Sequence, residues 1–394
     1  MSVFEKIRRP ISDRELERRW SALRELMAKE GLDAVMAQGN NMHLGGYVRW
    51  LTDIPAEYNY HMTVLFPAQG RMTLVRSSAS PVPEWALRGV EKIAAAPFAP
   101  TLQYTADLEA GLAVDWLREQ GAKRVGFIGA ASFHTAFVLK LKKALPETEW
   151  VDVTDAFDLL KALKSEEEMS LIRETARIHD LAWAALPAIA KPGMYEYQLR
   201  AELLHLLTDL GSEEHLMFMG TAEKGKPCGM STFQYANRRI QEGDYGVVLM
   251  EVSGPGGYYC ESARNFCFGE PYPELSKAWD VAVEAQQLTA DLLTPGRPAK
   301  EIVARYNAFV SERGYCQEGR LYGHSQGYDL VERPACMARH EFGEEDMSIY
   351  AGMNISLHPY FIDAVQTVYI NDNYQVTEQG AVKLHCTAPR IIII

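Results

Sequence analysis

The stretch Gly323-His324-Ser325-Gln326-Gly327-Tyr328-Asp329 stands between a segment with helical periodicity and a series of short strands. Its two glycines allow the backbone to bend tightly and to come close to whatever His324 faces. An imidazole in such a place can transfer a proton near neutral pH or bind a metal ion. For this stretch alone, the alternative is a glycine turn that merely contains a histidine. What favours a site is the presence of three ionisable residues on expected strands of the same half of the chain, namely Glu251, Glu261 and His358.

Length and composition indicate a two-domain globular protein. The chain has 394 residues, of which 47% are hydrophobic, and a formal net charge of −12. The negative charge argues against a nucleic-acid partner, because no basic face is available to neutralise phosphates. No apolar run is long enough to span a bilayer, and the N-terminus lacks the apolar core of a signal peptide. Six scattered cysteines without a C-x-x-C pair are typical of reduced thiols, so we expect a cytoplasmic protein.

The periodicity of the sequence changes near residue 155. Helical spacing that starts at Ser12 or Asp13 and ends at Gly31 is followed by alternating strands and helices, which predicts a small α/β domain over residues 1–155. A capping box at residues 165–168 then starts a long helix, and short strands dominate after residue 216. We therefore predict an α+β fold in which residues 156–394 form a catalytic domain.

Five motifs occur in order in this second part of the chain. They span Lys164 to Arg173, Asn237 to Asp244, Gly257 to Arg264, Gly323 to Asp329 and Ala351 to Pro359. They resemble the entry helix, the turn into the central sheet, the G-Y-x-x-D-x-x-R strand, the histidine turn and the P-G-M-x-x-x-x-E-P segment of the creatinase/aminopeptidase P family. The resemblance implies the pita-bread fold of that family, whose catalytic domain contains a curved antiparallel sheet.

Metallopeptidases of this family hold two divalent ions with two Asp, one His and two Glu. By resemblance, the matching positions here are Glu251, Glu261, His324 and His358, and the last ligand falls at Val365 or Gln366. Two further catalytic histidines of the family are replaced by Thr232 and Val331. Two adjacent divalent ions need bridging carboxylates to offset their repulsion, so we expect that the dinuclear site does not assemble.

We therefore expect a metal-independent, creatinase-like hydrolase that cleaves a carbon–nitrogen bond of a small, polar, nitrogenous, non-peptide compound, with no cofactor. His324 would act as general base toward water, and His358 as a second acid or base. Glu251 and Glu261 would bind a cationic or NH-rich substrate through charge-assisted hydrogen bonds.

Two alternatives remain open. In one, Glu251, Glu261, His324 and His358 bind a single divalent metal, which gives an Xaa-Pro dipeptidase-like hydrolase or a lyase. In the other, the protein is a catalytically inactive binding module, against which four retained ionisable groups argue.

The substrate pocket is expected to include further residues. Thr232 and Gln366 stand where the family places catalytic or metal-site groups, and Arg49, Tyr60 and His61 lie in an aromatic segment of the first domain. In the family, this domain of one subunit contributes to the pocket of the other. The resemblance therefore predicts a homodimer that binds a small-molecule substrate, with no nucleic-acid or membrane partner.

Overall fold

A computed structural model describes residues 9–39, 43–55, 61–76, 82, 84–96, 102–232, 235–337 and 348–394. The chain divides into two compact units, which are described separately. One comprises Pro10–Lys161, and the other comprises Ala162–Ile394 together with Arg9. The boundary thus lies a few residues beyond the expected division near residue 155.

The unit of residues 10–161 is a six-stranded mixed sheet with strand order β4-β3-β2-β1-β5-β6. Its strands are β1 (Ala34–Gly39), β2 (Met62–Pro67), β3 (Met72–Arg76), β4 (Val90–Ala95), β5 (Arg124–Ile128) and β6 (Glu149–Asp152). Its helices are α1 (Asp13–Glu30), α2 (Tyr47–Thr52), α3 (Leu102–Glu119), α4 (Thr135–Ala144) and α5 (Thr154–Ala162), with short 3-10 helices η1 (Glu84–Ala86) and η2 (Ala130–Ser132). The Ser12 side chain caps α1 by accepting from the Glu15 amide, and Gly31 ends the helix in the left-handed conformation at φ 65°.

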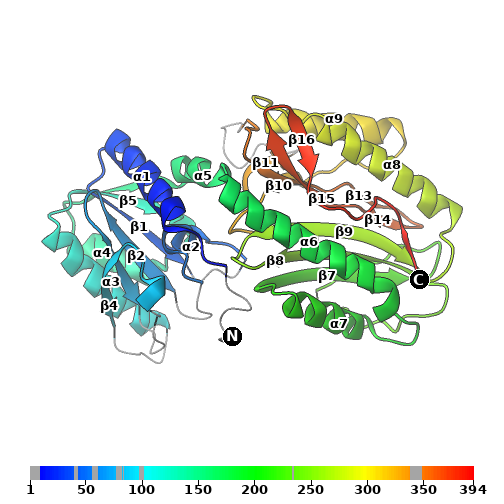
Figure 1. Ribbon diagram of the computed structural model, residues 1–394, viewed down its shortest axis with the longest axis horizontal. Coiled ribbons are helices and arrows are strands. Elements are labelled where there is room, and N and C mark those ends of the chain that lie inside the picture. The colour runs from blue at the N-terminus through cyan, green and yellow to red at the C-terminus, as the bar shows by residue number, and fades with distance from the viewer. Residues whose placement is uncertain are drawn as a thin grey trace. The chain divides into compact units, whose positions relative to one another are not determined.

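Over its described residues, the larger unit contains two sheets, which are antiparallel except for the parallel pairing of β17 with β9, and a hairpin. One sheet has the order β17-β9-β8-β7, the other β11-β10-β12-β15-β16, and β13 pairs with β14. The bounds are β7 (Glu214–Ala222), β8 (Tyr245–Ser253), β9 (Tyr259–Cys267), β10 (Leu321–Ser325), β11 (Glu332–Met337), β12 (Asn354–Leu357), β13 (Tyr360–Ile362), β14 (Thr367–Tyr369), β15 (Asp372–Thr377), β16 (Gly380–Lys383) and β17 (Ile392–Ile393). The helices are α6 (Glu166–Ile189), α7 (Glu196–Asp209), α8 (Pro273–Ala290) and α9 (Ala299–Glu312). Figure 1 shows α6 and α7 along β7, β8 and β9, and α8 and α9 beside the other sheet. The α+β fold predicted from the sequence is confirmed.

The two faces of β8 and β9 belong to different cores. Met250 and Val252 pack with residues of α6 and α7, whereas Leu249 and Ala263 pack with residues of α8 and α9. Successive side chains of a strand point to opposite faces. Glu251 and Glu261 therefore lie on the face away from α6, toward the second sheet.

The isoleucine tail forms an edge strand of its own chain. Ile392 and Ile393 pair in parallel with Phe266 and Cys267 of β9. The Asp180 carboxylate of α6 accepts hydrogen bonds from the backbone amides just before this tail, at Cys386 and Thr387. The tail is therefore part of the larger unit, although Ile393 is 50% exposed.

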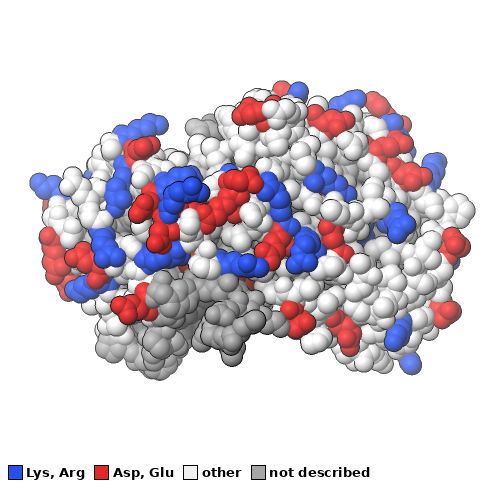
Figure 2. Space-filling view, viewed as in Figure 1, with Lys and Arg blue, Asp and Glu red and all other residues white. Residues whose placement is uncertain are grey.

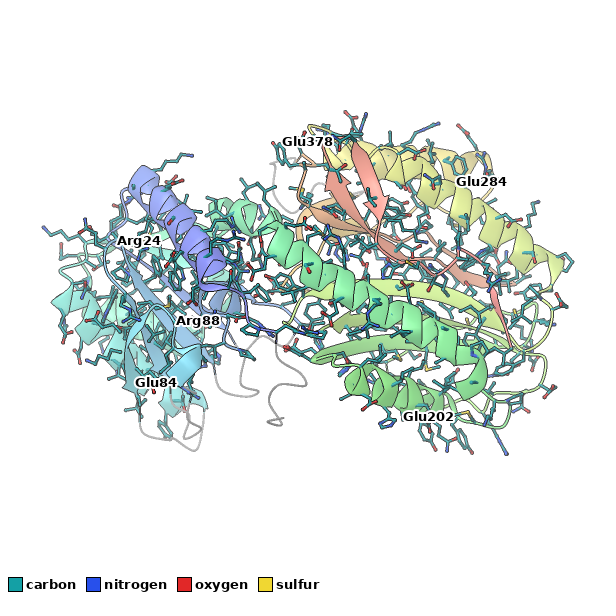
Figure 3. The ribbon with its side chains drawn as sticks, in the orientation of Figure 1. Arg24, Glu84, Arg88, Glu202, Glu284 and Glu378 are labelled. Atoms are coloured by element: carbon teal, nitrogen blue, oxygen red, sulfur yellow. The ribbon has the colours of Figure 1, made fainter. Side chains whose placement is uncertain are left out.

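Charged side chains are spread over the surface. Figure 2 shows acidic and basic residues interspersed on the visible face. In Figure 3, the exposed carboxylates Glu202, Glu284 and Glu378 lie on α7, on α8 and in the turn after β15. None of the helices in the described ranges combines the length and apolarity that a membrane crossing requires.

Candidate metal centre

Glu261, His324 and His358 come together inside the larger unit. Glu261 is on β9, His324 is on β10, and His358 directly follows β12. One possible ligand atom of each lies within 4.8 Å of those of the other two, and all three residues are buried. The sheet register explains this, because His324 pairs with Ser356 across β10 and β12. Three residues that are distant in sequence thus bring one carboxylate and two imidazoles close together.

The His324 ring is oriented by its backbone. Its Nδ1 lies 3.0 Å from the carbonyl oxygen of Ser325, which can only accept a hydrogen bond, so Nδ1 carries the proton. In the neutral ring, Nε2 then presents a lone pair, and this atom lies 3.5 Å from Glu261 Oε1. A lone pair facing a carboxylate oxygen is unfavourable unless a cation or a proton is shared between them. A carbonyl that fixes the tautomer in this way is the usual support of a metal-binding histidine.

Burial keeps the second imidazole neutral. Desolvation lowers the pKa of His358 to about 4, although the nearby charge of Glu261 acts in the opposite direction. The ring is therefore unprotonated near neutral pH, which is the form that binds a metal ion.

Glu251 and Glu261 face each other as a cross-strand pair of β8 and β9. Burial and then the charge of Glu261 raise the pKa of Glu251 well above its ordinary value, and the two side chains share a hydrogen bond. Burial also raises the pKa of Glu261, but the electrostatic interactions with His324 and His358, followed by the Glu251 and Ser356 hydrogen bonds, outweigh it and lower this pKa to about 2. In this pair the proton is therefore favoured on Glu251 and the negative charge on Glu261.

Hydrogen bonds hold both the carboxylate and the backbone amide of Glu261. Asn371 Nδ2 donates to Glu261 Oε1 at 2.7 Å, the Ser356 hydroxyl contacts the same oxygen, and Asn373 Oδ1 accepts from the Glu261 amide at 2.8 Å. Val365 and Gln366, where we expected the fifth ligand position, instead lie in the turn between β13 and β14. The residue beside Glu261 is Asn371, whose amide nitrogen is a donor and not a ligand.

The donor set of Glu261, His324 and His358 could hold a divalent ion. One carboxylate and two imidazoles with an open position are typical of catalytic zinc and suit manganese or iron as well. A second ion would need bridging carboxylates, and Glu261 Oε1 already accepts hydrogen bonds from Asn371 and Ser356.

Arg264 does not partner Glu261. Its guanidinium donates to Asp372 Oδ1 at 2.7 Å, and neither side chain is exposed. This places Arg264 on the opposite side of β9 from Glu261, as strand alternation predicts. Glu261 is therefore not the structural partner of this arginine.

The expected substrate residues belong to both units. Thr232 is half-buried, and its carbonyl accepts from the Tyr235 and Ala236 amides. Gln366 is buried and donates to Asp363 at 2.9 Å. Arg49 and His61 are buried in the other unit, where His61 Nε2 lies 2.6 Å from Glu109. Tyr60 lies outside the described residues. The roles of these residues in substrate binding stay predictions.

Comparisons with known proteins cover most of the chain. A family model described as "Metallopeptidase family M24" matches residues 170–378, more than half of the chain, and one described as "Creatinase/Prolidase N-terminal domain" matches residues 19–162. The chain is 24% identical to the probable dipeptidase PepE of Mycobacterium bovis over 310 residues, covering 74% of this chain and 80% of the relative. It is 24% identical to an Xaa-Pro dipeptidase of Pyrococcus horikoshii over 279 residues, covering 69% and 76%. In fold it matches the X-Pro aminopeptidase of Thermotoga maritima with a TM-score of 0.80 at 16% identity, over 95% of this chain and 99% of that one.

These findings correct two of our expectations. A metal-independent, creatinase-like hydrolase with a non-peptide substrate is wrong, because the matching model is that of metallopeptidases and the relatives are dipeptidases. The expected absence of a cofactor is wrong as well, since Glu261, His324 and His358 form a group able to hold a metal ion. The physical reason is that the changed residues remove bridging carboxylates but leave enough ligands for one ion. The protein is a hydrolase that acts on carbon–nitrogen bonds, and the chain belongs to metallopeptidase family M24.

Proposed function

We propose that the protein is a metal-dependent hydrolase of dipeptides or closely similar small amides, with one divalent ion held by Glu261, His324 and His358. The observation that carries the proposal is the convergence of these three ligands within 4.8 Å in a chain that matches a metallopeptidase family. The relatives named as dipeptidases support the substrate class.

When bound, a divalent ion at this centre supplies Lewis-acid activation of an amide carbonyl and of a nucleophilic water. The residues of the chain supply orientation and protons. Asn371 and Ser356 hold the Glu261 carboxylate in place, and the Ser325 carbonyl keeps the His324 proton on Nδ1.

Glu251 is the proton carrier in this proposal. Burial, and then the charge of Glu261, raises the pKa of this carboxyl and so favours its protonated form. Peptide cleavage requires a proton at the leaving nitrogen, and a buried acid with a raised pKa is suited to deliver it. Replacement of Glu251 by Gln keeps the hydrogen-bonding shape but removes the transferable proton, so we expect kcat to fall by roughly 10²- to 10⁴-fold.

The proposal also includes substrate recognition by Thr232 and Gln366. It includes a homodimer in which Arg49 and His61 of one chain complete the substrate pocket of the other. Sedimentation analysis of the purified protein tests the dimer. Arg49→Met and His61→Gln test the pocket through KM for a dipeptide.

The proposed function is tested with protein stripped by a chelator and then supplied with Zn²⁺ or Mn²⁺. We expect hydrolysis of dipeptides, alanyl-proline among them, only after an ion has been added. His324→Asn should lose both ion binding and turnover, whereas His205→Ala should lose neither, because His205 is exposed on α7. Full turnover in the chelated protein, or no cleavage of any dipeptide in the loaded protein, contradicts the proposal.

A further inference from the structure

The inner face of α6 carries three polar side chains at regular spacing. Thr175, His179 and Trp183 are four residues apart, so they follow one another along one face of the helix. Their exposures are 0%, 0% and 2%. Polar groups buried this deeply need hydrogen-bond partners, and all three find them on the strand pair β8–β9 or on the turn that joins it.

These three contacts, called tethers below, each reach a different residue of the strand pair or its turn. The Thr175 hydroxyl donates to the Tyr258 carbonyl at 2.9 Å. His179 Nε2 lies 3.2 Å from the Met250 carbonyl, and its Nδ1 lies 2.9 Å from the Thr175 carbonyl. A neutral imidazole has one N–H, so the ring donates to Met250 in the tautomer that carries the proton on Nε2. Trp183 Nε1 donates to Ser262 Oγ at 2.9 Å.

Two of these tethers end next to the acidic pair of the metal centre. Met250 and Ser262 are cross-strand partners, and the next pair along the strands is Glu251 with Glu261. Because neighbouring residues of a strand face opposite sides, α6 holds the strands from behind while the two carboxyl groups point to the centre. His179 fixes β8 one residue before Glu251, and Trp183 fixes β9 one residue after Glu261.

The close approach of the helix to the strands leaves little freedom. A Cβ added at Gly254, in the turn between β8 and β9, would lie 2.2 Å from Thr175 Oγ1. Figure 1 shows α6 running along β8 and β9 over much of their length. The register of both strands is thus set against one rigid helix.

We propose that His179 and Trp183 are positioning residues, which set the placement of Glu251 and Glu261 and through it the affinity of the centre for its divalent ion. This inference rests on the proposed function. Residues that orient metal ligands typically change metal affinity by about 10- to 100-fold when they are replaced. Neither residue touches the ion or the substrate in this arrangement.

The test compares His179→Phe and Trp183→Phe with Trp279→Phe as a matched control. Trp279 is a buried tryptophan of α8 whose Nε1 donates to the Pro389 carbonyl at 3.2 Å, and this bond does not involve β8 or the acidic pair. All three variants should show some loss in Tm. Only His179→Phe and Trp183→Phe should bind Mn²⁺ roughly 10- to 100-fold more weakly in calorimetry, with a lower kcat and a nearly unchanged KM for alanyl-proline. His179→Gln, which keeps one donor, should recover part of the affinity.

A second readout needs neither metal nor substrate. In chelated protein, amide hydrogen exchange over residues 250–252 and 260–262 should be faster in His179→Phe and Trp183→Phe than in Trp279→Phe. Equal exchange and equal Mn²⁺ affinity in all three variants would overturn the inference. If the wild-type protein binds no divalent ion, the proposed function fails together with the link to affinity, while the exchange rates still decide whether the tethers position the strands.

Discussion

Replacing Asn371 by Asp probes the contact that separates a one-metal centre from a two-metal centre. Asn371 is fully buried, and its amide donates to Glu261 Oε1 at 2.7 Å. The variant loses this donor, and a hydrogen bond to a charged acceptor contributes about 1.5–3 kcal/mol. It also places a second carboxyl against the first, where both cannot ionise together. We expect Asn371→Asp to lower the free energy of unfolding by about 3 kcal/mol at pH 8 in chelator.

The pH dependence of this deficit has a defined sign. Burial and the Glu261 anion raise the pKa of the new carboxyl above its unfolded value, so its contribution to stability is present at low pH and is lost as the pH rises. The deficit should therefore be smaller at pH 5 than at pH 8. Mn²⁺ offsets the repulsion between the two carboxylates, so its addition at pH 8 should also reduce the deficit.

Urea unfolding at both pH values, with and without Mn²⁺, measures these effects. Asn265→Asp is a matched control, because Asn265 is fully buried and its amide bonds to the backbone at Thr367 and Tyr369. The control should also be destabilised, but Mn²⁺ should not rescue it beyond the stabilisation that it gives to the wild-type protein. The reasoning is refuted if Asn371→Asp is as stable as the wild-type protein at pH 8 in chelator, or if Mn²⁺ rescues both variants equally.

Three further predictions concern stability. Burial lowers the pKa of His358 from 6.5 to about 4, so the stability that the neutral ring contributes is lost as the pH falls through this range. His358→Gln should therefore remove about 2–3 kcal/mol of the acid destabilisation that urea unfolding measures between pH 7 and 4.5. An unchanged dependence of the unfolding free energy on pH would contradict this. Arg264→Met leaves Asp372 buried without its main partner and should lower the free energy of unfolding by about 3–5 kcal/mol in urea. Arg297→Met, which breaks a more exposed ion pair, should lower it by under about 1 kcal/mol. Similar losses in both variants would contradict the importance of the buried pair. Deletion of residues 391–394 removes β17 from the edge of β9 and should lower stability by about 2 kcal/mol in thermal unfolding, so an unchanged Tm would show that the pairing contributes little.

Local signals in the sequence were sufficient to predict where helices begin. Ser165 and Glu168 form the predicted capping box at the start of α6, with the Ser165 amide donating to Glu168 at 2.7 Å. Such signals act over three or four residues, so they can be read without knowledge of the tertiary fold. Such local signals do not specify the break after Leu357, where β12 ends and the carbonyl of Pro359 accepts a hydrogen bond from the Ile370 amide before β13 begins.

The candidate site was predicted in part. Glu261, His324 and His358 could be named from the motifs, and the structure brings them together. Asn371 was missed because its position depends on the length of the β13–β14 hairpin, which the sequence pattern does not specify. An available signal was strand alternation, since Asn371 and Asn373 share the face toward Glu261. The missing bridging carboxylates led to the wrong expectation that no metal ion binds.

The most direct test of the account is the number and position of divalent ions in the purified protein. Elemental analysis together with anomalous diffraction from crystals grown with Zn²⁺ or Mn²⁺ gives both quantities. The account predicts one ion per chain, bound by Glu261, His324 and His358, and no second ion beside Asn371. Two ions bridged by Glu261, or a chain that hydrolyses dipeptides with no ion at these residues, would contradict it.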